Sequence, residues 1–152
     1  MPPFRYLLPA MAGSLLLAGI ALADTHATGS VAYRQHSMNA MAEHMAALKV
    51  ALTEQPSLIG EVGAHAAAIA ATSQFIPNMF PKDGNLTDSA ALPTVWDQAT
   101  EFAAAAKHNQ DLAQQLEETA RGGDVKATLA AFANLGRQGC GSCHETFRKA
   151  QG

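Results

Sequence analysis

The sequence predicts an all-α protein that folds as an antiparallel four-helix bundle. After residue 23, alanine, the strongest helix former, occupies 27 of 129 positions, whereas valine and isoleucine together occupy only eight. No run of residues alternates between apolar and polar as a half-buried strand does. The 152 residues are 48% apolar and 15% charged, which suits one domain with a real core and excludes a two-domain enzyme.

The first 23 residues have the pattern of a secretory signal peptide. Arg5 precedes an apolar run that ends in the A-x-A cleavage pattern Ala21-Leu22-Ala23. We therefore expect residues 1–23 to be removed and residues 24–152 to form an exported bundle domain without a membrane span. An uncleaved membrane anchor is the alternative interpretation, but the run is short for a span and contains a proline.

Cleavage would change the charge of the protein only slightly. It removes Arg5 and no acidic residue, so 9 Lys and Arg remain against 13 Asp and Glu, a net charge of −4. Binding to nucleic acid relies on neutralising phosphates with basic residues. The acidic balance therefore argues against a nucleic-acid partner.

Helix breakers and caps divide the domain into four helices, which we expect at 29–54, 57–76, 94–121 and 124–150. Pro56 separates the first two, a loop rich in proline at 77–93 separates the middle two, and Gly122-Gly123-Asp124 ends the third and caps the fourth. Short connections between neighbouring helices are typical of an antiparallel bundle.

Each predicted helix has one apolar stripe at a spacing of three and four residues, which predicts the core. The stripes are Met38, Met41, Met45, Leu48 and Leu52 in the first helix; Leu58, Val62, His65, Ile69 and Ile76 in the second; Val95, Ala99, Phe102, Ala106 and Leu116 in the third; and Val125, Leu129, Phe132, Cys143 and Phe147 in the fourth. Alanine occupies many stripe positions, which is compatible with a flat cofactor between the helices.

The only two cysteines form the motif Cys140-Gly141-Ser142-Cys143-His144, whose spacing is that of covalent haem c attachment. On an α-helix at about 100° per residue, the two thiols and the imidazole share an arc of about 100°. Two thioether bonds to haem vinyl groups and one bond from a neutral imidazole to iron can then meet one porphyrin. The sequence therefore predicts one haem c, with His144 as the proximal iron ligand.

Three other uses of a Cys-x-x-Cys pair are a structural disulfide, a redox dithiol and half of a zinc site. A redox dithiol normally opens a helix that follows a strand, and no strand is predicted before Gly139. A tetrahedral zinc site needs two further ligands at a recognisable spacing, and the chain has no other cysteine. Haem attachment is thus the favoured interpretation.

The chain resembles the class II c-type cytochromes, the cytochrome c′ family, which are four-helix bundles with a haem motif near the carboxyl end. The matching residues are Cys140 to His144 followed by Phe147 and Arg148, Tyr33-Arg34-Gln35-x-x-Met38, Trp96 with Phe102 and, more loosely, Phe80-Pro81. The resemblance spans the whole predicted mature chain. Its most specific part is the haem motif.

The resemblance implies that the first helix lies over the distal face of the haem. Met38 matches the position that holds either the sixth iron ligand or an apolar residue that blocks this site. The helical wheel leaves Met41 and Met45 open as well, because the three methionines fall within about 60° of one another.

Two arginines are also candidate contacts of the haem. Arg34 lies one turn before Met38, where it is expected either on the surface or paired with a haem propionate. Arg148 lies one turn after His144, near the proximal side.

The family has low-spin members, in which methionine completes six-coordinate iron, and high-spin members that bind nitric oxide or carbon monoxide. The carboxyl-terminal motif and the Phe80-Pro81 loop are more like the low-spin, cytochrome c-556 branch. We therefore expect a periplasmic one-electron carrier, not an enzyme, with His/Met-ligated iron and redox partner proteins. The alternative is a five-coordinate, gas-binding cytochrome c′. Homodimers occur among relatives, and the sequence leaves the assembly open.

The remaining histidines could compete as iron ligands. His36 and His44 point away from the predicted haem face and are expected in solvent, and His108 lies off its helix's stripe. His65 lies on the apolar stripe of its helix, where a hydrogen-bonded, partly buried histidine is expected. His26 precedes the first helix.

Overall fold

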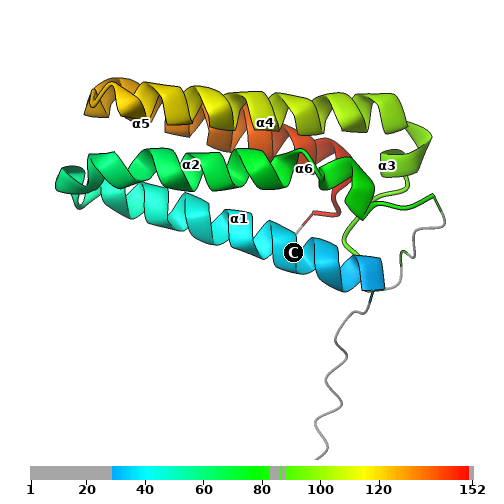
Figure 1. The fold of residues 1–152 in the computed structure, drawn as a ribbon. Coiled ribbons are helices and arrows are strands. Elements are labelled where there is room, and N and C mark those ends of the chain that lie inside the picture. The colour runs from blue at the N-terminus through cyan, green and yellow to red at the C-terminus, as the bar shows by residue number, and fades with distance from the viewer. Residues whose placement is uncertain (1–28, 83–85, 87, 151–152) are drawn as a thin grey trace, which may run out of the picture.

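The computed structural model describes residues 29–82, 86 and 88–150, and this part of the chain is a four-helix bundle, as predicted. Helices α1 (Gly29–Thr53) and α2 (Ile59–Ser73) form one antiparallel pair, joined through the short 3₁₀ turn η1 (Pro56–Leu58). Helix α4 (Ala99–Arg121) runs beside α5 (Val125–Asn134) and its continuation in the second layer (Figure 1). The predicted signal peptide and its cleavage site lie outside the described residues.

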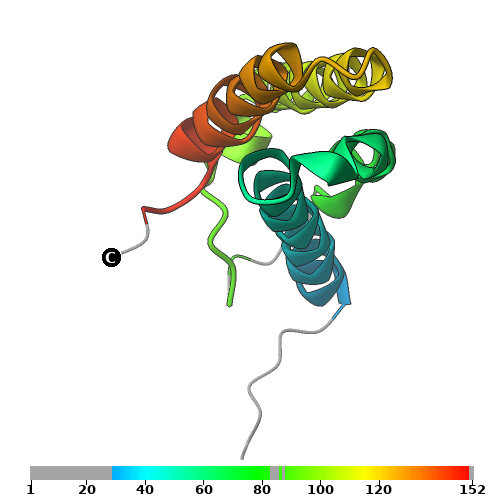
Figure 2. The same ribbon diagram turned by 90° about the vertical axis from the view of Figure 1, so that its left-hand side faces the viewer.

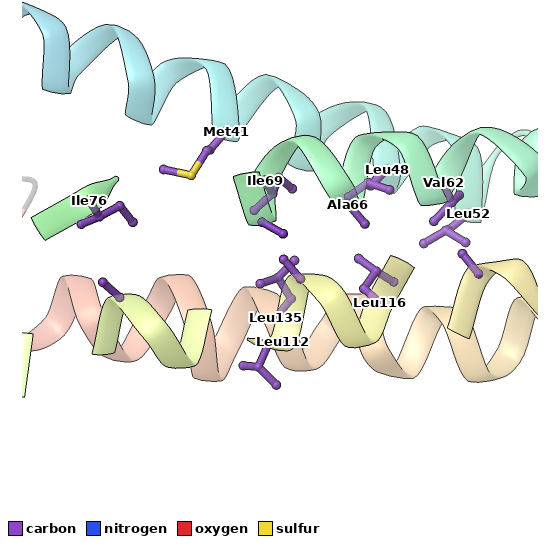
Figure 3. Close-up of a cluster of buried hydrophobic side chains, with 14 of the residues drawn as sticks. Met41, Leu48, Leu52, Val62, Ala66, Ile69, Ile76, Leu112, Leu116 and Leu135 are labelled. Carbon is purple, nitrogen blue, oxygen red and sulfur yellow. The ribbon is translucent and has the colours of Figure 1, made fainter. Parts of the chain in front are cut away.

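The core runs along the seam between the two layers, and α2 packs against both α1 and α4. The side chains of Leu48, Val62, Ile69, Leu116 and Leu135 are fully buried there (Figure 3). Burial of such a side chain contributes roughly 1.5–3 kcal/mol, so this seam fixes the spacing of the layers. The end-on view in Figure 2 shows the pair α1–α2 facing α4 and α5. Within the described residues, no helix is both long and apolar enough to span a bilayer.

The second and third helices are shorter than the sequence predicts. Helix α2 stops at Ser73, and a 3₁₀ turn, η2 (Ile76–Met79), leads into the central loop. The predicted third helix is interrupted at Gln98, which leaves helical geometry with φ −122° and ψ 50° and separates the short α3 (Thr94–Asp97) from α4. The indole of Trp96, on α3, donates a hydrogen bond to the Pro81 carbonyl at 2.8 Å, so this turn is tied to the loop.

The predicted fourth helix is divided into three segments. Asp124 caps α5 as expected, because its carboxylate accepts a hydrogen bond from the Ala127 amide at 3.0 Å. The π-helical segment η3 (Leu135–Gly141) follows and leads into α6 (Ser142–Phe147). Such π segments are rare and often occur at functional sites, and this one contains the first cysteine of the motif.

The last helix ends at Phe147 rather than near residue 150, because the chain after it pairs with the central loop. Arg148 is extended and forms an isolated antiparallel bridge with Ala91. The Leu92 amide donates to the Phe147 carbonyl at 3.0 Å, and the Lys149 amide donates to the Ala90 carbonyl at 2.8 Å. These bonds hold the central loop against the end of α6.

The segment η3 approaches α4 so closely that only glycine fits at residue 139. A Cβ atom placed on Gly139 would lie 2.5 Å from the side-chain oxygen of Asn109 and 3.1 Å from a methyl group of Leu135. Both neighbours are buried and cannot move away freely.

We expect Gly139→Ala to destabilise the holoprotein by roughly 1–3 kcal/mol, because overpacking of a core has this effect. Chemical denaturation measures the change.

The matched control is Gly60→Ala in α2, where an added Cβ meets no atom within 4 Å. Because alanine is the better helix former, this change is expected to be neutral or to stabilise the protein by up to about 1 kcal/mol. Equal stability losses for the two variants would show that the contact at Gly139 does not constrain the packing.

Candidate haem-binding site

A cavity of about 760 Å³ lies between α1 and the carboxyl-terminal segment. Its volume is within the range of roughly 300–1,000 Å³ that is usual for small-molecule sites. All six site residues predicted from the sequence line it, namely Arg34, Met38, Cys140, Cys143, His144 and Arg148. The structure thus brings together residues that are more than a hundred positions apart in the chain.

The two cysteines reach the cavity from the π segment η3 and from the start of α6. Both are free thiols and partly buried. Burial raises the pKa of the Cys140 thiol, and burial together with the neighbouring Cys140 raises the pKa of Cys143 to about 11. Both sulfurs are therefore protonated near neutral pH.

This protonation state argues against use of the pair as a redox dithiol, which depends on a thiolate with a lowered pKa. Within the described residues, no group of three or more His, Cys, Asp or Glu side chains is placed to hold a metal ion. Two neutral thiols on a largely apolar cavity wall fit covalent attachment to a flat, apolar cofactor instead.

His144 lines the cavity one residue after Cys143, on the first turn of α6. Burial, and secondarily the charge of Arg148, lowers the pKa of His144. The imidazole is therefore neutral near pH 7 and has a nitrogen lone pair free for iron. The two thiols and the imidazole line a single cavity, although Cys140 lies in the π segment η3 and not on the regular α-helix for which the shared arc was predicted.

Three methionines of α1 line the opposite wall of the cavity, and their surroundings differ. The sulfur of Met41 lies 3.8 Å from the oxygen of Ser73, whose hydroxyl donates its one proton to the Ile69 carbonyl at 2.7 Å. The terminal methyl of Met45 lies next to Gly136 of η3, since a Cβ placed on that glycine would be 3.7 Å from it. Met38, half-buried on the same wall, lies one turn nearer to the amino terminus. All three methionines thus line the cavity, and only Met41 is fully buried among them.

Arg34 is buried, with an exposed fraction of 6%, so the interpretation of this residue as an ordinary surface cation is wrong. Its guanidinium donates hydrogen bonds to the Met79 carbonyl at 3.1 Å and to the Ser89 hydroxyl at 2.6 Å. It also lies 4.4 Å above the centre of the Phe80 ring, a cation–π distance. Burial lowers the pKa of Arg34, but an arginine remains charged at neutral pH.

An aromatic cluster closes one end of the cavity. The ring of Phe102 makes edge contacts with Phe80 and with Phe147, at centroid distances of 4.8 and 5.1 Å. Trp96 packs on the outer side of Phe80 at 6.2 Å and is not part of the cavity wall. Phe102 and Phe147 were predicted on apolar stripes, whereas Phe80 was predicted only in the central loop, and the structure places all three at the cavity.

A buried polar pair beside Cys140 was not predicted. The Asn109 side chain of α4 donates a hydrogen bond to the Ser73 hydroxyl at 2.8 Å, and its carbonyl oxygen lies 3.5 Å from the sulfur of Cys140. Asn109 occupies a position on the apolar stripe of α4, between Ala106 and Ala113. A polar residue at such a position is the signal from which it could have been found.

The comparisons with known proteins agree with this geometry. A family model described as Cytochrome C′ matches residues 29–148. The cytochrome c′ of Pararhodospirillum photometricum is 38% identical over 120 residues, which cover 78% of this chain and 95% of the relative. The cytochrome c-556 of Agrobacterium fabrum is 29% identical over 143 residues, which cover 93% of this chain and 95% of that protein.

A solved structure of similar fold is the nitric oxide complex of a cytochrome c′ variant from Alcaligenes xylosoxidans. It superimposes with a TM-score of 0.72 at 26% sequence identity and covers 80% of this chain and 94% of that one. Relatives named cytochrome c′ and relatives named cytochrome c-556 both match, so the comparisons do not resolve the branch. The bundle, the cysteine pair on its cavity and the family match over residues 29–148 together show that this chain belongs to the cytochrome c′ family, whose haem c is bound covalently through the carboxyl-terminal cysteine pair.

Proposed function

We propose that this chain is a periplasmic one-electron carrier in which His144 and Met38 are the two axial ligands of the haem iron. The family consists of haem proteins that are not enzymes, so the function lies in electron transfer or in ligand binding. The observation that carries the proposal is the position of the two residues. The thioether of Met38 on α1 and the imidazole of His144 on α6 line one cavity from different layers of the bundle.

The choice of Met38 among the three methionines rests on burial and on the family resemblance. Met41 is buried, whereas Met38 and Met45 are half-buried on the cavity wall. Of these two, Met38 is the residue that matches the family's distal position, and we choose it for that reason.

The bound haem supplies the one-electron Fe(III)/Fe(II) couple. Bound to the iron together with His144, Met38 would raise the reduction potential, and ligands that stay in place in both oxidation states would reduce the reorganisation that accompanies electron transfer. Arg34 and Arg148 line the same cavity, and their positive charges would pair with the carboxylates of the haem. We assign them to the haem propionates on this basis.

We also propose export through the signal peptide at residues 1–23, so that the mature chain begins at Asp24. The support is the charged, apolar and A-x-A pattern of this segment. The partners of such an exported carrier would be redox proteins that give it an electron or take one from it. Amino-terminal sequencing of the protein purified from a periplasmic fraction tests the cleavage site.

A gas-binding function is the second candidate, and one observation favours it. The similar solved structure is a nitric oxide complex of a cytochrome c′, and a cytochrome c′ is also among the relatives with more than 35% identity. In this function the distal position would be empty of a protein ligand. Met38 would then pack beside the haem rather than bind its iron.

Replacement of the distal methionine tests the axial ligand. We expect Met38→Leu, which keeps the apolar volume but removes the sulfur, to convert a low-spin ferric and ferrous absorption spectrum into a high-spin one. The matched control Met45→Leu changes the same residue type on the same wall and should leave the spectrum low-spin. A spectrum that is unchanged in Met38→Leu would refute the assignment.

Carbon monoxide binding separates the two candidate functions. We expect the ferrous wild-type protein to bind carbon monoxide slowly, because the methionine must first leave the iron, and Met38→Leu to bind it rapidly. Stopped-flow absorption measurements on the two proteins provide the rates. Equally rapid binding by both proteins would support the gas-binding function instead.

A further inference from the structure

Two histidines that the haem site does not use meet on the α1–α2 side of the bundle. The Nδ1 atoms of His44 on α1 and His65 on α2 lie 2.9 Å apart, with ring centroids 5.1 Å apart and planes inclined by 58°. The expectation that His44 lies free in solvent is therefore wrong, since it is half-buried against His65. The expectation of a partly buried, hydrogen-bonded His65 is confirmed.

This pair is separate from the haem cavity. Met41, Ala42 and Met45 of α1 line that cavity, whereas neither His44 nor His65 does. The contact joins the two helices of the first layer, near the buried side chains of Leu48 and Ile69, each one turn further along its own helix. The backbone on both sides of the pair is thus held in place by the core.

The hydrogen bond requires a different role for Nδ1 in each of the two rings. One imidazole must carry its proton on Nδ1 and donate it, while the other must present an Nδ1 lone pair. If the donor ring moves its proton to Nε2 through solvent, both Nδ1 atoms carry lone pairs. A rotation of both rings away from the line between the two nitrogens then directs these lone pairs to one point beside the pair. Neutral imidazole nitrogens are common ligands of transition metals.

We propose that His44 and His65 form a two-histidine site for a divalent transition metal of square geometry, with Cu(II) as the best-fitting ion. With metal–nitrogen bonds of about 2.0–2.1 Å, two nitrogens 2.9 Å apart subtend an angle of about 90° at the metal. This is the angle between neighbouring ligands in tetragonal Cu(II) and Ni(II) sites. A tetrahedral ion such as Zn²⁺ would hold the two nitrogens about 3.3 Å apart.

The pair offers two ligands to an ion. In the part of the chain that the structure describes, no third His, Cys, Asp or Glu side chain joins the pair to complete a metal-binding group. Water or small external ligands therefore fill the other positions, and the ion is exchangeable. The two helices supply the preorganisation, because their relative position does not depend on the metal.

The test uses the mature, haem-loaded protein and Cu(II) as the probe, with calorimetric titration and electron paramagnetic resonance. His26 is the third residue after the predicted cleavage site, and a free amino group followed by two amides and an imidazole chelates Cu(II) by itself. Every protein compared therefore carries His26→Gln. On this background the variants are His44→Gln, His65→Gln and, as the matched control, His36→Gln, which changes an exposed histidine of the same helix.

We expect the background protein and His36→Gln to bind one Cu(II) with the same affinity and to show a tetragonal copper signal split by two nitrogens. His44→Gln and His65→Gln should each weaken binding by at least about tenfold, since loss even of residues that only support metal ligands costs about 10–100-fold. Unchanged haem absorption and far-ultraviolet circular dichroism would show that these variants are folded. Equal Cu(II) affinity in all four proteins, or no binding by the background protein, would overturn the proposal.

Discussion

The contact between the backbone at Gly139 and the side chain of Asn109 is the constraint on which the haem site depends. It determines how closely η3 approaches α4, and hence where the sulfur of Cys140 lies, 3.5 Å from the Asn109 oxygen. At the end of the following helix α6, the carbonyl of Phe147 accepts a hydrogen bond from the central loop. His144 lies between these two anchors, so the cysteines and the imidazole approach the cavity as one unit.

The electrostatics of the cavity follow from its burial. The thiols and the imidazole are all neutral near pH 7, because burial disfavours a thiolate at Cys140 and Cys143 and an imidazolium at His144. The buried positive charge at the wall, Arg34, is held by a carbonyl, a hydroxyl and an aromatic ring. A largely apolar pocket with cations at its wall suits a haem, whose body is apolar and whose propionate substituents are acidic.

Apolar stripes and breakers were sufficient to predict the bundle, and the Cys-x-x-Cys-His spacing was sufficient to predict Cys140, Cys143 and His144 as one site. Met38 and Arg34 were expected at that site only because of the family resemblance. The π segment was missed because a spacing of three and four residues does not reveal one extra residue in a turn. Its signal was the cluster of Gly136, Gly139 and Gly141 just before the second cysteine. The end of α6 was misplaced because pairing with Ala91 is a tertiary contact, which local helix propensity does not encode.

The histidine pair illustrates the same limit. A helical wheel shows which residues of α1 share a face, but it cannot show what α2 places opposite them. His44 was therefore assigned to solvent, although the facing helix brings His65 within hydrogen-bond distance. Arg34 is likewise buried by a tertiary contact that the wheel cannot show, because the residues that bind its guanidinium, Met79 and Ser89, lie outside α1.

The most direct measurement of the iron ligand is a proton NMR spectrum of the reduced holoprotein with the methionine methyl groups assigned. The ring current of the haem shifts the methyl group of an iron-bound methionine far upfield from all other methyl signals. We expect one such resonance, and we expect it to belong to Met38. The absence of an upfield methyl signal, or its assignment to Met41 or Met45, would contradict ligation by His144 and Met38.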